Sequence, residues 1–398
     1  MRKHKLDFPL LLLVLALMVM GAIVIFAVGP RVAIFENSIG ADFSEDFFIK
    51  RHLIAILFSI VAIAIGVKVP IEKLKQSGKW FLLVGLALCL GVFVFGRVGA
   101  GFVTCDEGAC RAFRFGPFGF QPIEVVKIGI LLYISWLIRD RKERDLLDKS
   151  DFWLPLGVTS AVVAFVSGVL LKDFGSVMVI VTMIFYMMFI AGVPLKNLGI
   201  AIAICGVAFL FLIAFSPHRR ARLANYFGAG DEYHITGSLI AMGTGGLTGV
   251  GLGNSIQSTG YLPETLSDSI FAIICEVWGL VGATLTLLFF AGIIARIFKI
   301  SKHSPDKENS YICLGVFAWV LAHVIINVGG MTGITPMKGI TLPFLSYGGT
   351  SMMFISFAIG VVLQISTWTK REAINNNENT SSWRGQRRSR YAGHSRRS

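Results

Sequence analysis

Long apolar runs alternate with short polar segments along most of this chain. Each run has roughly the 17 to 25 residues that a helix needs to cross the hydrocarbon core of a membrane. The pattern therefore predicts an all-α, polytopic membrane protein with about ten transmembrane helices. The run that starts at Asp268 is longer than one span, which predicts a tilted or extended helix. The predicted spans are residues 9–28, 53–69, 80–96, 123–138, 153–171, 174–193, 196–216, 268–298, 309–331 and 343–367.

The distribution of Lys and Arg predicts the orientation of these helices, because short connections rich in these residues stay in the cytoplasm. With ten helices, all the basic connections and the tail fall on one side, so both termini are predicted to be cytoplasmic. We predict a membrane domain over residues 1–369 with a large outer loop at 217–267, followed by a basic, disordered tail at 370–398. The basic connections are residues 2–5, 73–79, 139–149 and 299–307.

Composition supports a polytopic membrane protein. Hydrophobic residues make up 54% of the chain and charged residues only 15%, against about 25% in a typical soluble protein. The first apolar run is too long for a signal peptide and is predicted to be a retained span. The net charge of +13 is assigned to contact with membrane lipids, and no nucleic acid partner is expected.

Several cations lie in loops that this orientation places outside, against the usual bias. Either they bind an anion there or they reach for lipid headgroups, and the sequence leaves both interpretations open. They are Arg97, Arg111, Arg114, Arg219, Arg220, Arg222 and Lys338.

The stretch from Ile240 to Gly282 brings a glycine-rich polar run to the start of an apolar helix. Its acids are Glu264, Asp268 and Glu276. Asp268 at the mouth of a membrane helix can be an N-cap, a functional acid or both. If the helix already includes Asp268, then Glu276 lies on the same face, since eight residues are close to two turns.

Three further polar groups lie near the predicted outer surface. Glu124 and Lys127 stand three residues apart inside the membrane boundary, which fits a structural ion pair and substrate contact equally well. Asp173 lies between two spans. Lys338 lies in a Gly- and Pro-rich segment at 334–351, whose irregular backbone needs cover from protein or water.

One outward-facing acid with several cations suits transfer from a lipid diphosphate. The leaving group is already good, so one base for an incoming hydroxyl is enough. The diphosphate would be held by cations, either alone or with a divalent ion such as Mg²⁺ or Mn²⁺. These residues alone do not separate a transferase from a transporter of lipid diphosphates.

Five motifs in this order resemble the SEDS family (shape, elongation, division and sporulation), and its FtsW branch most closely. They cover most of the chain from the third predicted helix onward. The motifs are FGPFGFQPIEVVK at 115–127, KDFGS at 172–176, GLTGVGLGNSIQ at 246–257, YLPETLSDSIFAIICEVWG at 261–279 and PMKGITLPFLSYGGTS at 336–351.

The resemblance implies a ten-helix peptidoglycan glycosyltransferase that polymerises lipid II into a nascent glycan strand outside the membrane. It implies a class B penicillin-binding protein as partner, other cell-division proteins nearby, and a place at the division septum. The family's catalytic acid falls on Asp268. Other motif positions, with implied roles in binding substrate, fall on Arg111, Glu124, Lys127, Asp173, Glu264 and Lys338.

The chain departs from the family's motifs at seven positions. The family's His-Thr-Asp-Phe is here Leu266-Ser267-Asp268-Ser269, and Ala112 replaces a Trp after the arginine. We expect a divergent active polymerase, and Leu266, Ser269 and Ala112 mark where its acceptor contacts would differ. The other departures are Ile123 for Ser, Lys172 for Pro and Val277 for Glu.

Two other functions stay open. A lipid II transporter would need charged groups through the full depth of the membrane, whereas here they gather near the outer surface. A non-catalytic scaffold for the division machinery would fit the lost His and Trp. Separately, Cys105 and Cys110 lie five residues apart in an outer loop, as either a small disulfide loop or two free thiols.

Overall fold

The computed structural model describes residues 6–106, 109–116, 118–147, 149–214, 232–335 and 339–368. All ten predicted spans fall on helices, which confirms the all-α membrane fold. Among the described residues, eight helices are long and apolar enough to cross a membrane. The helices are α1 (Phe8–Ser38), α2 (Phe47–Lys68), α3 (Ile71–Arg97), α4 (Pro122–Glu143), α5 (Ser150–Ala164) with the π-helical segment Phe165–Leu170, α6 (Phe174–Ala191), α7 (Leu195–Ala214), α9 (Glu232–Gly245), α10 (Ile270–Lys302), α11 (Lys307–Met331) and a last helix at Gly349–Trp368.

The eight candidate spans leave out α4 and α7. Helix α4 has the length of a span but carries Glu124 and Lys127 near its start and a charged run at its end. Helix α7 has 20 residues and a strongly apolar sequence. Adding these two helices gives the ten that the hydrophobic pattern predicts.

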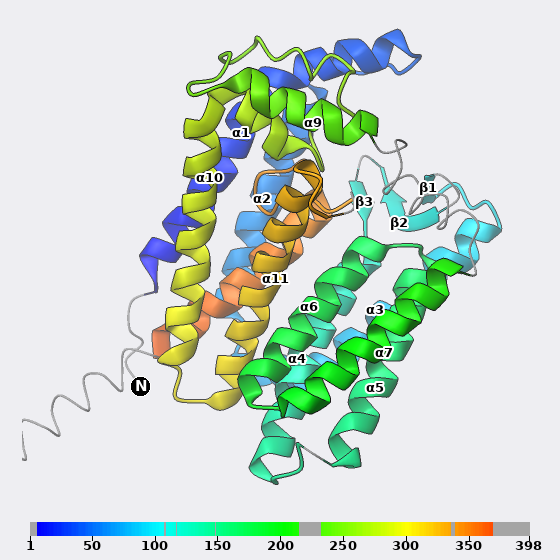
Figure 1. The fold of residues 1–398 in the computed structure, drawn as a ribbon, viewed down its shortest axis with the longest axis vertical. Helices are drawn as coiled ribbons and strands as arrows, with labels where there is room; N and C mark the ends of the chain where they lie inside the picture. Colours follow the sequence, from blue (N-terminus) through cyan, green and yellow to red (C-terminus); the bar gives the residue numbers. More distant parts are fainter. Residues whose placement is uncertain are drawn as a thin grey trace, which may run out of the picture.

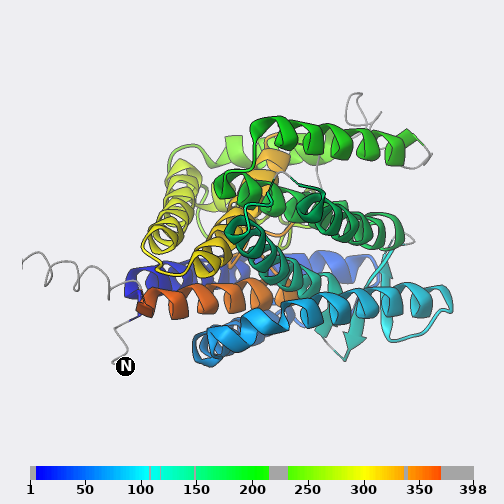
Figure 2. The same ribbon diagram turned by 90° about the horizontal axis from the view of Figure 1, so that it is seen from below.

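Helix α11 is at the centre of the bundle (Figures 1 and 2). Its most apolar window is 78% buried, the highest share among the eight candidate spans. It packs against α4, α6, α9 and α10. Helices α3 and α4 approach closely through small residues, because a Cβ added to Gly129 would lie 2.5 Å from the Leu82 nitrogen.

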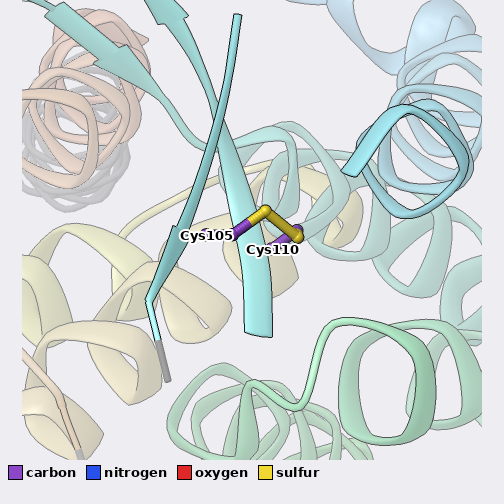
Figure 3. Close-up of a disulfide and its surroundings, with 2 residues drawn as sticks. All are labelled: Cys105 and Cys110. Atoms are coloured by element: carbon purple, nitrogen blue, oxygen red, sulfur yellow. A yellow bond between two sulfur atoms is a disulfide. The ribbon is translucent and has the colours of Figure 1, made fainter. Parts of the chain in front are cut away.

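A three-stranded antiparallel sheet lies at the end of the bundle that the Lys and Arg distribution places outside, here called the outer end (Figure 1). Cys105 and Cys110 pair across β1 and β2 and form a disulfide that links these two strands (Figure 3). The disulfide packs on the last turn of α3, where a Cβ on Gly96 would lie 2.5 Å from the Cys110 sulfur. The strands are β1 (Val103–Asp106), β2 (Ala109–Phe115) and β3 (Phe118–Phe120).

Helix α10 is broken near its outer end, at Gly279, which has φ 62° and ψ −155°. At the break, backbone N–H and C=O groups of α10 form hydrogen bonds with the glycine-rich loop at 246–257 instead of within the helix. Gly251 N donates to Val277 O at 3.0 Å, and Leu280 N donates to Gly246 O at 2.9 Å. The glycines therefore let one backbone dock on another.

Replacing Gly249 with alanine is expected to destabilise this docked loop strongly. Gly249 has φ +83°, and an added Cβ would lie 2.1 Å from the Val277 carbonyl oxygen. Gly253→Ala is the matched control, because Gly253 has φ +84° but open space around an added Cβ. A left-handed alanine costs roughly 1–2 kcal/mol, and forced overpacking adds about 1–3 kcal/mol. Thermal unfolding in detergent should show Gly249→Ala melting well below Gly253→Ala; equal midpoints would contradict the close approach.

Candidate functional site

Asp268 lies at the outer end, in the loop that leads into α10. The helix begins at Ile270, and its N-cap residue is Ser269, whose side chain makes no cap hydrogen bond. The Ser269 hydroxyl instead donates to Pro263 O at 2.8 Å. The N-cap interpretation of Asp268 is therefore wrong, and its carboxylate is free for another role.

The carboxylate of Asp268 faces Gly339, a residue without a side chain. A Cβ added to Gly339 would lie 3.2 Å from Asp268 Oδ2. Gly339 is followed by Ile340, which packs on Gly175 near the start of α6. The segments that begin at Asp173 and at Gly339, far apart in sequence, therefore meet beside Asp268.

The pKa of Asp268 is raised from 3.8 to about 7, and burial is the largest cause. Within that shift the neighbouring carboxylates of Glu264 and Asp173 also raise the pKa, and the Arg111 guanidinium lowers it. A pKa close to neutral lets a carboxylate accept a proton from a substrate and release it again. Of the acids predicted from the sequence, Asp268 has the electrostatic setting of a general base.

Glu264 lies four residues before Asp268 in a strained turn, with φ +49°. Its Oε2 accepts from the Ser267 hydroxyl at 2.6 Å. The exposed side chain borders a pocket of about 320 Å³ between this loop and the outer ends of α1 and α2, which Glu36 and Tyr347 also line. This position suits contact between Glu264 and a polar ligand in that pocket, which Asp268 itself does not line.

Arg111 and Asp173 belong to one cluster with Asp268. The Arg111 Nη2 donates to the Lys172 carbonyl at 3.1 Å, which joins β2 to the start of α6. Asp173 is the N-cap of α6, and its Oδ1 accepts from Ser176 N at 3.0 Å. Arg111 Nε is buried with no hydrogen-bond partner among the described residues. Arg111 is thus a cation near Asp268 with donor capacity to spare.

Glu124 and Lys127 lie deeper in the bundle. Lys127 Nζ is 2.7 Å from Glu124 Oε1, and the two side chains are 3% and 2% exposed. Lys127 Nζ also lies 5.8 Å from the centre of the Trp319 ring. The geometry is that of an interior ion pair rather than of an open surface site.

Glu276 does not share a face with Asp268, because α10 begins only at Ile270. It is fully buried and anchors the glycine-rich loop. Its Oε2 accepts from the Ser255 hydroxyl at 2.6 Å, and its Oε1 accepts from Ile256 N at 2.8 Å and Gln257 N at 3.2 Å. Glu276 is therefore a structural residue.

Lys338 lies outside the described residues, as do Arg219, Arg220 and Arg222. Among the residues that the structure does describe, no three His, Cys, Asp or Glu side chains form a group that could hold a metal ion. A divalent cation thus stays a prediction from the diphosphate chemistry.

Two residues of α11 hold the site together, and their spacing is the signal that sequence reasoning did not use. Asn327 Nδ2 donates to Asp268 O at 2.7 Å and to Ile340 O at 2.8 Å. His323 Nδ1 lies 2.9 Å from Thr341 O. The two side chains are four residues apart and so share one face of the helix.

Comparison with known proteins decides the family. The model of the cell cycle protein family that contains FtsW, RodA and SpoVE matches residues 8–371. The chain belongs to this family. It is 32% identical over 376 residues to a probable peptidoglycan glycosyltransferase FtsW of Coxiella burnetii, covering 92% of this chain and 97% of the relative. It is 30% identical over 378 residues to the stage V sporulation protein E of Bacillus subtilis, covering 93% and 99%.

The fold of this FtsW/RodA/SpoVE family member also occurs in solved structures. The rod shape determining protein RodA of Thermus thermophilus superimposes with a TM-score of 0.65 at 21% identity, covering 91% of this chain and 96% of RodA. A chain of a solved peptidoglycan synthase complex gives a TM-score of 0.72 at 22% identity, covering 92% and 99%. These comparisons confirm the resemblance to the SEDS family and its fold.

Most residues at which this family member departs from the motifs are buried in the interior. Leu266 is 4% exposed, and its carbonyl accepts from Tyr347 N at 2.8 Å. Ser269 is fully buried. The Leu266 side chain therefore packs in the interior, and the Ser269 hydroxyl holds the turn through Pro263 O. Of the other departures, Ala112, Ile123 and Val277 are buried, while Lys172 has φ +54°.

Proposed function

We propose that this chain is a peptidoglycan glycosyltransferase that polymerises lipid II at the outer face of the cytoplasmic membrane, with Asp268 as its general base. The observation that carries the proposal is the setting of Asp268. It is an acid whose pKa is raised to about 7, with Gly339 beside its carboxylate and Arg111 close enough to lower that pKa. The relatives named peptidoglycan glycosyltransferase support the activity.

In the proposed reaction, Asp268 accepts the proton of the acceptor sugar hydroxyl. The hydroxyl oxygen forms a bond to the anomeric carbon of the donor, and the bond from that carbon to the diphosphate breaks. The lipid diphosphate leaves with the electron pair, and the configuration at the anomeric carbon inverts. Asp268 then releases its proton to water, so that the base is restored.

Charge on the leaving diphosphate is stabilised by nearby cations. Arg111 is the one described cation that acts on the pKa of Asp268, and its buried Nε has no hydrogen-bond partner among the described residues. Lys338 is the second predicted cation. Asp173 and Glu264 are assigned to hold the polar parts of the substrate, and no step is drawn through a metal ion.

The proposed setting is the division septum, with both termini in the cytoplasm and a class B penicillin-binding protein as the cross-linking partner. The FtsW names of the relatives support a role in division. The similarity to a chain of a peptidoglycan synthase complex supports a synthase partner.

A transporter of lipid II is the second candidate, and a non-catalytic scaffold the third. A transporter would use charged groups along an open path, whereas Glu124 and Lys127 are buried and paired with each other. The acids around Asp268 gather at one end of the bundle, which favours chemistry at a surface.

The deciding experiment uses the purified full chain, with and without its partner penicillin-binding protein, in liposomes that contain lipid II. A polymerase yields glycan strands that a muramidase digests. A transporter moves lipid II between leaflets and yields no strands. A scaffold does neither, and if no strands form even with the partner present, the proposed activity is wrong.

A further inference from the structure

One face of α11 carries three polar side chains at intervals of four residues, namely Trp319, His323 and Asn327. All three are almost fully buried in the centre of the bundle. Buried polar groups in a membrane interior are costly unless they are paired, so their pairing shows what they hold.

The hydrogen bonds of this face form a chain in which Trp319 donates to His323 and His323 donates to Thr341. Trp319 Nε1 can only donate, and it donates to His323 Nε2 at 3.2 Å. His323 Nδ1 lies 2.9 Å from the carbonyl oxygen of Thr341, which can only accept. These two contacts require a neutral imidazole with its proton on Nδ1. His323 therefore ties α11 to the segment that follows Gly339.

Asn327 makes the decisive link. Both hydrogens of its amide are used, one on the carbonyl of Asp268 at 2.7 Å and one on the carbonyl of Ile340 at 2.8 Å. Ile340 follows Gly339, whose α-carbon borders Asp268 Oδ2. One side-chain amide thus fixes the peptide of Asp268 and the backbone that faces its carboxylate.

We propose that Asn327 is the positioning residue of Asp268 and that His323 supports it. By holding the two loops at one spacing, Asn327 sets where the Asp268 carboxylate meets the acceptor hydroxyl. This inference rests on the proposed function of Asp268 as the base. It adds a residue that acts through the backbone and never touches substrate.

Asn327 lies in a buried position. Its side chain is 4% exposed, and its Oδ1 is buried with no partner among the described residues. An aspartate would fill the same space but has no N–H, and it would place an acceptor against two carbonyl oxygens. Asn327→Asp therefore removes the link with almost no change of volume.

The test measures lipid II polymerisation by the full chain with its partner, over a range of pH, for Asn327→Ala and Asn327→Asp. Both variants are expected to lose about 10- to 100-fold in kcat, because a base displaced by about 1 Å costs that much. KM for lipid II should change less than kcat. In Asn327→Ala, water reaches the loosened carboxyl, so the acid limb of the pH profile should move to lower pH.

The matched control is Asn309→Ala. Asn309 is an equally buried asparagine of the same helix, 6% exposed, and it lies at the opposite end of α11. It should keep the wild-type kcat and pH profile. His323→Gln retains an N–H donor toward Thr341 and should keep more activity than His323→Ala, which supplies a test if the Asn327 variants do not fold.

Two results would overturn the inference. One is wild-type kcat in both Asn327 variants. The other is a loss that follows only the folded fraction, with an unchanged pH profile and with His323→Gln no better than His323→Ala. If Asp268→Asn itself polymerises normally, then the proposed function has failed, which is a distinguishable outcome.

Discussion

The Asp268→Asn variant is expected to lose polymerisation of lipid II by at least about 100-fold, because general-base catalysis contributes roughly 10²- to 10⁴-fold. Asparagine keeps the shape of the side chain. The hydrogen bonds that hold the loop use backbone carbonyls, that of Asp268 with Asn327 and that of Leu266 with Tyr347, so the substitution leaves them in place. The fold and lipid II binding should therefore survive. The measurement is the initial rate of glycan strand formation by the purified protein with its partner.

The pH dependence of the wild-type enzyme gives the same prediction a second readout. Asp268 works as a base only when ionised, and its pKa is raised to about 7. The rate should therefore rise with pH up to about 7 and level off above it. In Glu264→Gln one of the carboxylates that raise this pKa is gone, so the acid limb should move to lower pH.

The matched control for Asp268→Asn is Asp42→Asn, which changes an exposed acid in another predicted outer loop. It should polymerise at the wild-type rate. Full activity in Asp268→Asn would remove Asp268 from the mechanism. An acid limb unchanged by Glu264→Gln would show that another group controls the pH profile.

Breaking the Glu124–Lys127 pair is expected to have the largest effect on stability. Lys127→Met leaves the Glu124 carboxylate buried without its partner, and removing one member of a buried pair costs roughly 3–5 kcal/mol. The Glu124 side chain is only 2% exposed, so water does little to offset this. The yield of folded protein and the thermal midpoint in detergent should both fall sharply.

The double variant Glu124→Gln with Lys127→Met separates the two roles that the sequence left open. Neither of its two side chains carries a charge that must be buried. If the pair is structural, the double variant should therefore recover both folding and activity. The burial of both side chains leads us to expect that recovery. A double variant that folds but does not polymerise would instead assign the pair to substrate binding.

Several features of this protein could be predicted because they depend on local sequence. Apolar runs of span length locate helices whatever their neighbours are, since a membrane forces backbone groups to pair within a segment. Each of the ten predicted ranges overlaps a helix for that reason, although the last helix begins at Gly349 rather than at 343. The motif around Asp268 also gave a prediction of the catalytic acid, because it is a continuous string of residues.

Other features depend on contacts between distant segments, and the local pattern misassigned them. Asp268 looked like an N-cap because it precedes an apolar run, but Pro263 and Glu264 turn the chain so that the helix starts at Ile270. Glu276 looked like a second acid of the site, yet it binds the loop at 255–257. The glycine-rich run forms hydrogen bonds with the backbone on both sides of the break at Gly279. The hydrophobic pattern of α10 does not predict that break.

The sequence by itself determined that this is a polytopic membrane protein and predicted a functional acid at Asp268, because hydrophobic runs and a contiguous motif are properties of the chain. Only the tertiary structure decided the state of that acid. Its raised pKa needs burial and the approach of Glu264 and Asp173, opposed by Arg111. Its position needs Asn327, which is 59 residues away. Electrostatic shifts and backbone placement arise from distances in space, and one folded arrangement sets them.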